Sequence, residues 1–209
     1  MLRIIILNYK RPDNVKAICQ AFHKYFPITV INNNPKTTFT FKSKNVTVIN
    51  NNKNKMCIER WIRCFEFDEP YKLVLDDDLL PSPLLVKKML SLDQTIVGIY
   101  GKANVPKASR YEMLTDHWCV NAKVDFLVGS IVMVKQEALN YIKDDLIKFQ
   151  NLERGDDIVV SYLIKKVYNY KFLKTITGKV LNLPEGDVGL NKHSSHFKKR
   201  WEVLQQCLN

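Results

Sequence analysis

The sequence lacks the features that mark several specialised classes of protein. Its five cysteines show neither an even count nor a C-x-x-C spacing, which argues against a disulfide framework or a zinc site and predicts a reduced, cytoplasmic protein. No apolar run approaches the length that spans a membrane, and apolar residues 2–7 are followed at once by polar ones, so we expect neither a signal peptide nor a membrane span. The chain also contains no internal repeat and no Gly/Ser linker.

Acidic residues are the minority charge. The 209 residues include 32 Lys and Arg against 21 Asp and Glu, which leaves a formal charge of +11 and favours a phosphate-bearing or polyanionic partner. There is no arginine-rich arm and no recurring basic and aromatic pattern, so nucleic acid is not expected as a partner. With 46% hydrophobic residues, the chain is expected to form a single domain, residues 1–209, with a sizeable core.

Three adjacent aspartates, Asp76, Asp77 and Asp78, end a short apolar run that begins at Tyr71. Such a run predicts a buried strand of a parallel sheet, and ligands bind outside the carboxyl ends of these strands. Neighbouring carboxylates repel one another unless a cation or hydrogen-bond donors hold them, and Mg²⁺ or Mn²⁺ with a diphosphate would suit them. The alternative is that they only cap a following helix over residues 84–90.

The first third of the chain predicts a βαβ unit. A strand over residues 2–7, a helix over 14–25 capped by Asp13, and a strand over 28–31 follow one another. The loops after both strands would then face one crevice, where Asn8 and residues 32–34 could pair with a base or ribose, Tyr9 could stack on a base and Arg11 could meet a phosphate. Equally, these residues could be simple turn formers.

The middle of the chain alternates further strands and helices. We expect strands over residues 45–50, 95–101 and 124–134, and helices over 54–67 and near 82–90. The apolar spacing of the 54–67 helix leaves Arg60 on a different face from Trp61, where a surface position is the default. Gly129, inside the most apolar strand, indicates a bulge or the close approach of another group.

Two acidic residues, Asp156 and Asp157, precede an apolar helix over residues 158–167. They are explained either as caps that complement the helix dipole or as carboxylates that serve the site as a general base or orienting group. Near the end of the chain, His196 and Arg200 lie one helical turn apart and could act on one ligand.

Taken in order, these motifs resemble the metal-dependent, GT-A-fold glycosyltransferases that use nucleotide sugars, and among them the exostosin-like transferase domain. The likeness covers nearly the whole chain and extends to transferase domains of large algal viruses. It rests on the following segments: Tyr9–Lys10–Arg11, Asn32–Asn33–Asn34, Asn54–Lys55–Met56 with Arg60, Asp76–Asp77–Asp78, Ile96–Val97–Gly98, Val128–Gly129–Ser130, Asp156–Asp157–Ile158 and His196-x-x-x-Arg200.

The resemblance implies an α/β fold, with a Rossmann-like, mixed and mostly parallel sheet flanked by helices. It divides the single domain into a nucleotide-binding half, about residues 1–80, and an acceptor and catalytic half, about 81–209. It further implies a hexosyltransferase that moves a sugar from a UDP-sugar donor to a hydroxyl of a glycan or glycoprotein acceptor, with Mn²⁺ or Mg²⁺ as cofactor.

The resemblance also assigns roles to individual residues. Asp78 would be the direct metal ligand, and Asp76 would also belong to the metal site. Asp76 and Asp77 together would serve the nucleotide and the metal's hydration shell. Asp157, with Asp156 beside it, would lie at the reacting carbon, and Arg200 with His196 would steady the leaving diphosphate. The residues implied to hold the nucleotide are Asn8, Tyr9, Arg11, Asn33, Asn54 and Arg60. Lys10, Cys57 and Arg154 depart from the family pattern.

Two other functions stay open at this point. A sugar nucleotidyltransferase also uses a metal and an α/β sheet, but it should carry a Gly-rich loop after the first strand, and residues 8–12 contain no glycine. A non-catalytic module that binds nucleotide sugars or nucleic acid is favoured by the basic charge. The transferred sugar, the acceptor and the stereochemistry are not determined by these residues.

Overall fold

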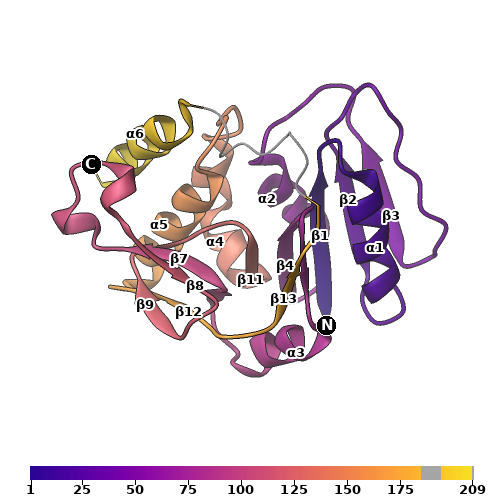
Figure 1. Ribbon diagram of the computed structural model, residues 1–209, viewed down its shortest axis with the longest axis horizontal. Coiled ribbons are helices and arrows are strands. Elements are labelled where there is room, and N and C mark those ends of the chain that lie inside the picture. The colour runs from indigo at the N-terminus through magenta and orange to yellow at the C-terminus, as the bar shows by residue number, and fades with distance from the viewer. Residues whose placement is uncertain (185–193, 209) are drawn as a thin grey trace.

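A twisted sheet of eight strands forms the centre of the computed structural model, which describes residues 1–184 and 194–208 (Figure 1). In sheet order the strands are β3 (Val46–Asn50), β2 (Ile28–Asn32), β1 (Leu2–Asn8), β4 (Tyr71–Asp76), β11 (Ile131–Lys135), β6 (Ile96–Gly98), β12 (Leu173–Thr175) and β9 (Ala122–Val124).

The first four strands of this order run parallel. β1 pairs in parallel with both β2 and β4, and β2 pairs in parallel with β3, whereas β11 runs antiparallel to its neighbours β4 and β6. Asn8 is opposite Asn32 and Leu7 is opposite Asp76, so the carboxyl ends of three strands meet at one edge. The predicted βαβ unit and the mixed, mostly parallel sheet are confirmed.

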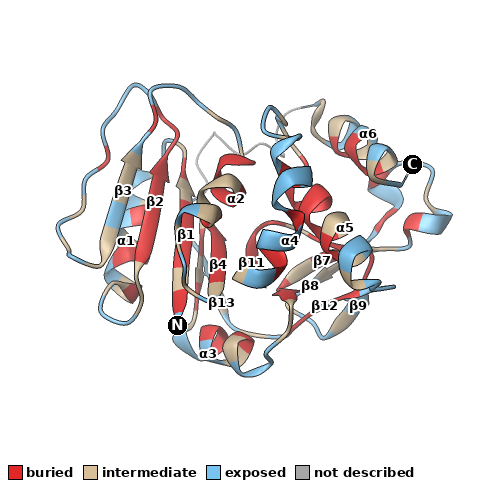
Figure 2. Cartoon of the chain, turned by 180° about the vertical axis from the view of Figure 1, so that it is seen from behind, coloured by how far each residue is buried: buried red, intermediate tan, exposed pale blue. Residues whose placement is uncertain are grey.

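Helices cover both faces of the sheet (Figure 2). On one face, α1 (Pro12–Phe22) and α3 (Pro83–Ser91) pack on Ile4 and Ile6 of β1; on the other, α2 (Glu59–Arg63), α4 (Gln136–Ile147) and α5 (Asp156–Tyr168) pack on the side of Ile5. α6 (His196–Leu208) lies against α5. Because β1 is buried on both faces, its sequence reads as a continuous apolar run.

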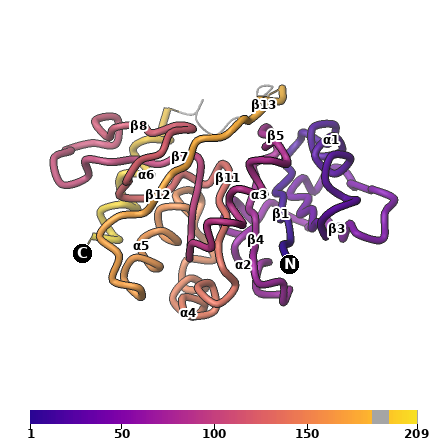
Figure 3. Tube along the Cα trace, turned by 90° about the horizontal axis from the view of Figure 1, so that it is seen from below, coloured from indigo at the N-terminus to yellow at the C-terminus, as the bar shows by residue number. Residues whose placement is uncertain are grey.

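Two small sheets complete the structure. β7 (Tyr100–Ala103) lies between β10 (Phe126–Leu127) and β8 (Thr115–Trp118), and β13 (Val180–Asn182) pairs with β5 (Leu79–Pro81). Figure 3 shows β7 and β8 at the end of the molecule opposite to β1 and β3. Single 3-10 turns are η1 (Cys64–Glu66), η2 (Val105–Lys107) and η3 (Tyr111–Met113).

The helix predicted over residues 54–67 is shorter in the structure. Met56 has a left-handed backbone, with φ of 60°, and the Asn54 side chain accepts a hydrogen bond from its N–H at 2.9 Å. This side-chain turn competes with helix formation, so α2 begins only at Glu59 and gives way to η1 after Arg63. Met56 is consequently exposed, rather than part of an apolar helix face.

The strand predicted over residues 124–134 is divided among β9, β10 and β11, and the strand predicted over 95–101 is divided between β6 and β7. Asp125 leaves the first run to accept a hydrogen bond from the N–H of Val105 at 2.9 Å, and the chain turns again at Gly129 and Ser130 before β11. Residues 95–101 cross from the central sheet to the small one between β6 and β7. An uninterrupted apolar run does not reveal such changes of direction, because both segments are buried.

Two predicted helix caps are wrong. α1 begins at Pro12 after Arg11, with Asp13 inside its first turn, because the fixed φ of proline suits the first helical position. Ser82 caps α3 by accepting a hydrogen bond from the N–H of Leu85 at 3.2 Å, and β5 separates α3 from the aspartates. Helix capping therefore does not explain Asp76 to Asp78. Among the described residues, no helix has the length and apolarity to cross a membrane.

Candidate active site

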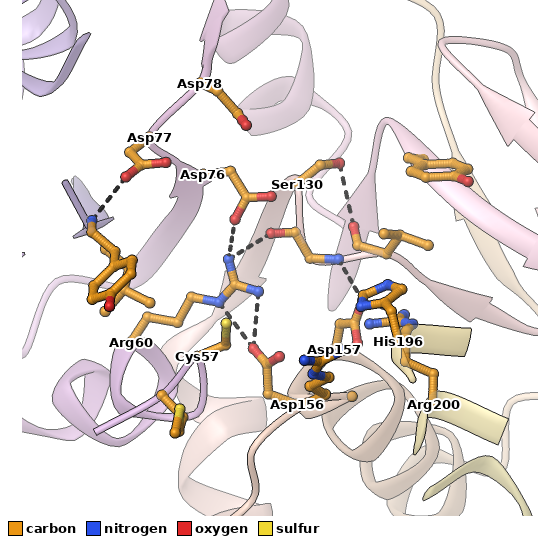
Figure 4. A pocket seen from close by; sticks show the side chains of 18 of the residues that line it. Cys57, Arg60, Asp76, Asp77, Asp78, Ser130, Asp156, Asp157, His196 and Arg200 are labelled. Atoms are coloured by element: carbon orange, nitrogen blue, oxygen red, sulfur yellow. Dashed lines mark hydrogen bonds and ion pairs between the residues drawn. The ribbon is translucent and has the colours of Figure 1, made fainter. Parts of the chain in front are cut away.

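A cavity of about 470 Å³ lies at the edge where β1, β2 and β4 end. Except for Asn8, Asn32 and Asn34, the residues that the sequence assigned to the site line it: Tyr9, Arg11, Asn33, Asn54, Arg60, Asp76, Asp77, Asp78, Asp156, Asp157, His196 and Arg200. These side chains come from both halves of the chain (Figure 4).

Asn8 is buried behind the cavity wall. Its amide nitrogen donates to Oδ1 of Asn32 at 3.0 Å, and its Oδ1 accepts from the N–H of Arg11 at 3.2 Å. Asn8 thus ties the loops after β1 and β2 together. Asn33 does line the cavity, and it too is held by the protein, since it donates to the carbonyl oxygen of Met56 at 3.0 Å and accepts from Asn51 at 2.8 Å.

Arg60 is buried between two acidic groups, and its expected surface position is wrong. Its Nη1 lies 2.5 Å from Oδ1 of Asp76 and its Nε 2.9 Å from Oδ2 of Asp156, while Nη1 also donates to the carbonyl oxygen of Gly129 at 2.8 Å (Figure 4). Only 4% of the residue is exposed. Burial works against the charged form, but Asp156 and Asp76 outweigh it and keep the pKa of Arg60 above its ordinary value.

Gly129 is required by this approach of Arg60. A Cβ at position 129 would lie 2.4 Å from Nη2 of Arg60 and 3.2 Å from Cβ of Asp157. The close approach that the glycine predicted is therefore made by a guanidinium group of the protein itself, at a point where Gly129 also lines the cavity.

The protein uses both carboxylate oxygens of Asp77. Oδ2 accepts from the N–H of Tyr9 at 2.9 Å and Oδ1 lies 2.5 Å from Nη1 of Arg11. The same Arg11 nitrogen is 3.0 Å from Oδ2 of Asp78. Asp77 therefore fixes the loop after β1, and Arg11 offsets part of the acidic charge.

The carboxyl group of Asp76 has an unusual pKa. Burial raises its pKa to about 7, the charges of Asp78 and Asp77 add to the rise, and Arg60 opposes it. The side chain nevertheless keeps 41% of its surface exposed, and the contact with solvent limits the rise. A cation near Asp76 and Asp78 would relieve the repulsion that remains among the three aspartates beside Arg60 and Arg11.

The strand-end aspartates fit a hard divalent cation. Asp76 and Asp78 offer carboxylate oxygens with exposed side-chain surface, 41% and 24%, inside the cavity. Within residues 1–184 and 194–208, no group of three or more His, Cys, Asp or Glu residues is arranged to hold a metal alone. Mg²⁺ and Mn²⁺ commonly take one or two protein carboxylates and fill their other positions with water and phosphate oxygens.

Asp156 and Asp157 occupy the first turn of α5. Gly155 precedes them with φ of 84°, and a Cβ there would lie 3.1 Å from Val203, so glycine allows the sharp entry. Asp156 accepts from Nε1 of Trp61 at 2.8 Å in addition to Arg60. Neither aspartate is the N-cap residue, which disfavours capping as their main role.

Asp157 is held from two sides. Its Oδ2 accepts from the N–H of Gly129 at 2.9 Å and from Nη2 of Arg200 at 2.8 Å. Burial alone would raise the pKa of Asp157, but Arg200 and these hydrogen bonds lower it below its usual value, so Asp157 is ionised at neutral pH. Arg200 also donates through Nε to the hydroxyl of Tyr111 at 2.7 Å.

The free energy of unfolding at acidic pH should depend on the ion pair between Asp157 and Arg200. Because the folded-state pKa of Asp157 is lowered, its contribution is complete above the unfolded value of about 3.9 and is lost as pH falls through the folded value. We expect the free energy of unfolding of Asp157→Asn to fall less steeply than that of the wild type below about pH 4, measured by urea denaturation. Exposed Asp144→Asn should follow the wild type. Equal slopes for Asp157→Asn and the wild type would contradict the assignment.

The cavity also contains residues that the sequence did not single out. Tyr100, Lys102, Tyr111, Trp118 and Phe197 form its wall in the second half of the chain. Tyr100 and Lys102 alternate along a strand, and this spacing could have indicated that they share a face. No short-range sequence pattern connects Tyr111 with Arg200.

No protein-family model matches the chain, and no curated protein matches it. Solved structures do match. S. aureus TarS 1-349 in complex with UDP-GlcNAc is similar with a TM-score of 0.64 and 11% identity, over 99% of this chain and 65% of that one. GalNAc-T7 with UDP, GalNAc and Mn²⁺ is similar with a TM-score of 0.62 and 11% identity, over 97% of this chain and 47% of that one. The chain thus has the predicted GT-A fold and spans less than two thirds of the length of either protein.

Proposed function

We propose that this chain is a metal-dependent glycosyltransferase that moves a sugar from a UDP-sugar to a hydroxyl group of a glycan acceptor. The observation that carries the proposal is the ionised, doubly held Asp157 in the same cavity as the strand-end Asp76 and Asp78. The GT-A fold supports it, as do the UDP-GlcNAc bound to TarS and the UDP and Mn²⁺ bound to GalNAc-T7.

The donor nucleotide is assigned to the first half of the cavity. The backbone of Tyr9 is fixed by Asp77, which presents the Tyr9 ring for stacking on uracil, while Asn33 and Asn54 line the same side. Arg11 and Arg60 are the cations closest to the aspartates and would face the diphosphate. Lys10, which departs from the family pattern, lies beside the ring of Tyr9, with Nζ 5.1 Å from its centroid.

Asp78 and Asp76 would hold Mn²⁺ or Mg²⁺, which when bound would neutralise charge on the leaving diphosphate. The first role assigned to Arg200 is to hold Asp157, because its Nε donates a hydrogen bond to Tyr111 and its Nη2 donates one to Asp157. His196, at the start of α6 and in the cavity wall, is assigned with Arg200 to the diphosphate. Asp156 positions Arg60, and through it the strand end.

Asp157 is the group that would act at the reacting centre. An ionised carboxylate can accept the proton of an acceptor hydroxyl, which inversion requires, or stabilise an oxocarbenium-like sugar carbon, as in a retaining reaction. Both roles need the same held, charged oxygen. A sugar nucleotidyltransferase is disfavoured, since the loop after β1 contains no glycine and is instead fixed by Asp77.

A thermal-shift titration tests the donor site. UDP together with Mn²⁺ should raise the melting temperature, because a ligand that binds only folded protein at 100 times its Kd adds about 2.7 kcal/mol, or roughly 5 to 11 °C for a domain of this size. GDP, dTDP and CMP should give smaller shifts. The metal-dependent part should vanish in Asp78→Asn and persist in exposed Asp68→Asn. If UDP gives the same shift with and without Mn²⁺, the metal assignment is contradicted. If none of the nucleotides shifts the melting temperature, the donor site is contradicted.

A further inference from the structure

One face of the small β7–β8 sheet carries a paired arrangement of side chains. Tyr100 and Lys102 alternate along β7 and so point to the same face, where Trp118 and Asp116 of β8 lie directly opposite them. Tyr100, Lys102 and Trp118 all line the cavity. We call Tyr100 and Trp118 the aromatic pair.

The aromatic pair is held rigidly but keeps an open surface. The two rings meet edge to face with centroids 5.3 Å apart, and the hydroxyl of Tyr100 donates to Asp116. Asp116 is in turn 2.7 Å from Nζ of buried Lys102. Trp118 nevertheless remains 41% exposed. An exposed tryptophan whose neighbours are fixed offers a preformed apolar surface with polar groups beside it.

A chain of contacts joins this face to Asp157. Nζ of Lys102 lies 4.9 Å from the ring centroid of Tyr111, and Tyr111 accepts a hydrogen bond from Arg200, which holds Asp157. Phe197 stacks on Tyr111 with centroids 5.6 Å apart. The wall that carries the aromatic pair and the carboxylate at the proposed reacting centre therefore belong to one connected unit.

The position of this face separates it from the donor residues. β7 and β8 lie at the opposite end of the molecule from β1 and β3 (Figures 1 and 3), whereas Tyr9, Arg11 and Asp77 follow β1 and β4. Asp157 comes from α5, which packs against β10 of the small sheet, and Arg200 comes from α6, which packs against η3 between β7 and β8. The aromatic pair and Asp157 line the same cavity.

We propose that Tyr100 and Trp118 bind a sugar ring of the glycan acceptor and present its hydroxyl group to Asp157. The inference deepens, and rests on, the proposed glycosyltransferase function. A sugar ring has an apolar C–H face that packs on an aromatic ring and hydroxyl groups at its rim that pair with polar side chains, here Lys102 and Asp116. A nucleobase also stacks on rings, but the donor assignment places it at Tyr9.

The test uses an array of immobilised oligosaccharides, probed with the fluorescently labelled full chain, together with the melting shift given by UDP and Mn²⁺. Trp118→Ala should weaken binding to the glycans that the wild type recognises by about tenfold or more. Trp118→Tyr, which retains a ring, should recover most of that binding. Tyr25→Ala removes an exposed ring from outside the cavity and should bind as the wild type does. All three variants should show the wild-type melting shift with UDP and Mn²⁺.

The two readouts separate this inference from the proposed function. A UDP shift with no glycan bound, or with glycans bound equally by Trp118→Ala, overturns the acceptor subsite and leaves the donor assignment standing. Loss of the UDP shift in Trp118→Ala, with an unchanged melting temperature of the unliganded protein, assigns the aromatic pair to the nucleotide and also overturns the proposal. Absence of any UDP shift in the wild type contradicts the proposed function itself.

Discussion

Asp157→Asn is expected to lower sugar transfer by about 10²- to 10⁴-fold, the range for removing a positioned proton-transfer group. The asparagine side chain has nearly the size of aspartate, and its carbonyl oxygen can still accept from Gly129 and Arg200. It carries no charge, and its N–H₂ group would then replace the oxygen that accepts from the N–H of Ile158. UDP binding, which depends on the other half of the cavity, should stay close to that of the wild type. The measurement is UDP release from a panel of UDP-hexoses, with mixed oligosaccharides as acceptors.

Asp144→Asn is the matched control, since it makes the same change on the exposed side of α4 and should leave UDP release unaltered. The melting temperature of Asp157→Asn must be recorded as well, because Arg200 loses part of its pairing. Unchanged turnover in a folded Asp157→Asn protein would remove Asp157 from the reaction. A wild type that binds UDP but releases none from any donor would support the binding-module alternative.

Arg60→Met should be the most destabilising substitution in the site. It leaves Asp156, whose side chain is 4% exposed, without its cation, and breaking a buried pair in this way costs about 3 to 5 kcal/mol. For a domain of this size, the melting temperature should fall by roughly 6 to 20 °C. Thermal unfolding followed by circular dichroism measures the effect.

Arg63→Met provides a control on the same helix. Arg63 pairs with Glu59 at 2.7 Å and with Glu66, but its side chain is 21% exposed, so we expect a loss of at most about 1 kcal/mol. Adding Asp156→Asn to Arg60→Met should restore part of the stability, because it removes the uncompensated charge. If Arg60→Met and Arg63→Met have the same melting temperature, the pairing of Arg60 with Asp156 does not stabilise the fold as we expect.

The parts of the site that could be predicted from sequence depend on local pattern. The strand ends of a βαβ unit meet at one edge, so the apolar runs and the polar residues that follow them are enough to bring Tyr9 and Asn33 together. Asp76 ends a further buried strand that pairs in parallel with β1, so it reaches the same edge. Helical spacing similarly places His196 near Arg200. These rules use only short stretches of chain and the geometry of parallel strands.

The remaining features depend on contacts between distant segments. Arg60 is separated by 96 residues from Asp156, and Arg200 by 89 from Tyr111, so periodicity in either segment contains no information about the pair. The chain turns at Gly129, where Arg60 of a distant segment leaves no room for a side chain, and the apolar run itself contains no sign of this contact. Met56 adopts a left-handed backbone within an apparently regular apolar spacing.

The bridge from Arg60 to Asp156 has a consequence for the order of folding. β1, β2, β3 and β4 pair through contacts within the first 76 residues, while α5 and α6 follow much later in the sequence. Arg60 can therefore pair with Asp156 only after α5 has been synthesised. Asp157 can pair with Arg200 only after α6 has been synthesised. A nascent or proteolytically shortened chain could keep a formed nucleotide half without a formed reaction centre. Activity would then depend on a docking step that follows the formation of the first half, later than the appearance of its secondary structure.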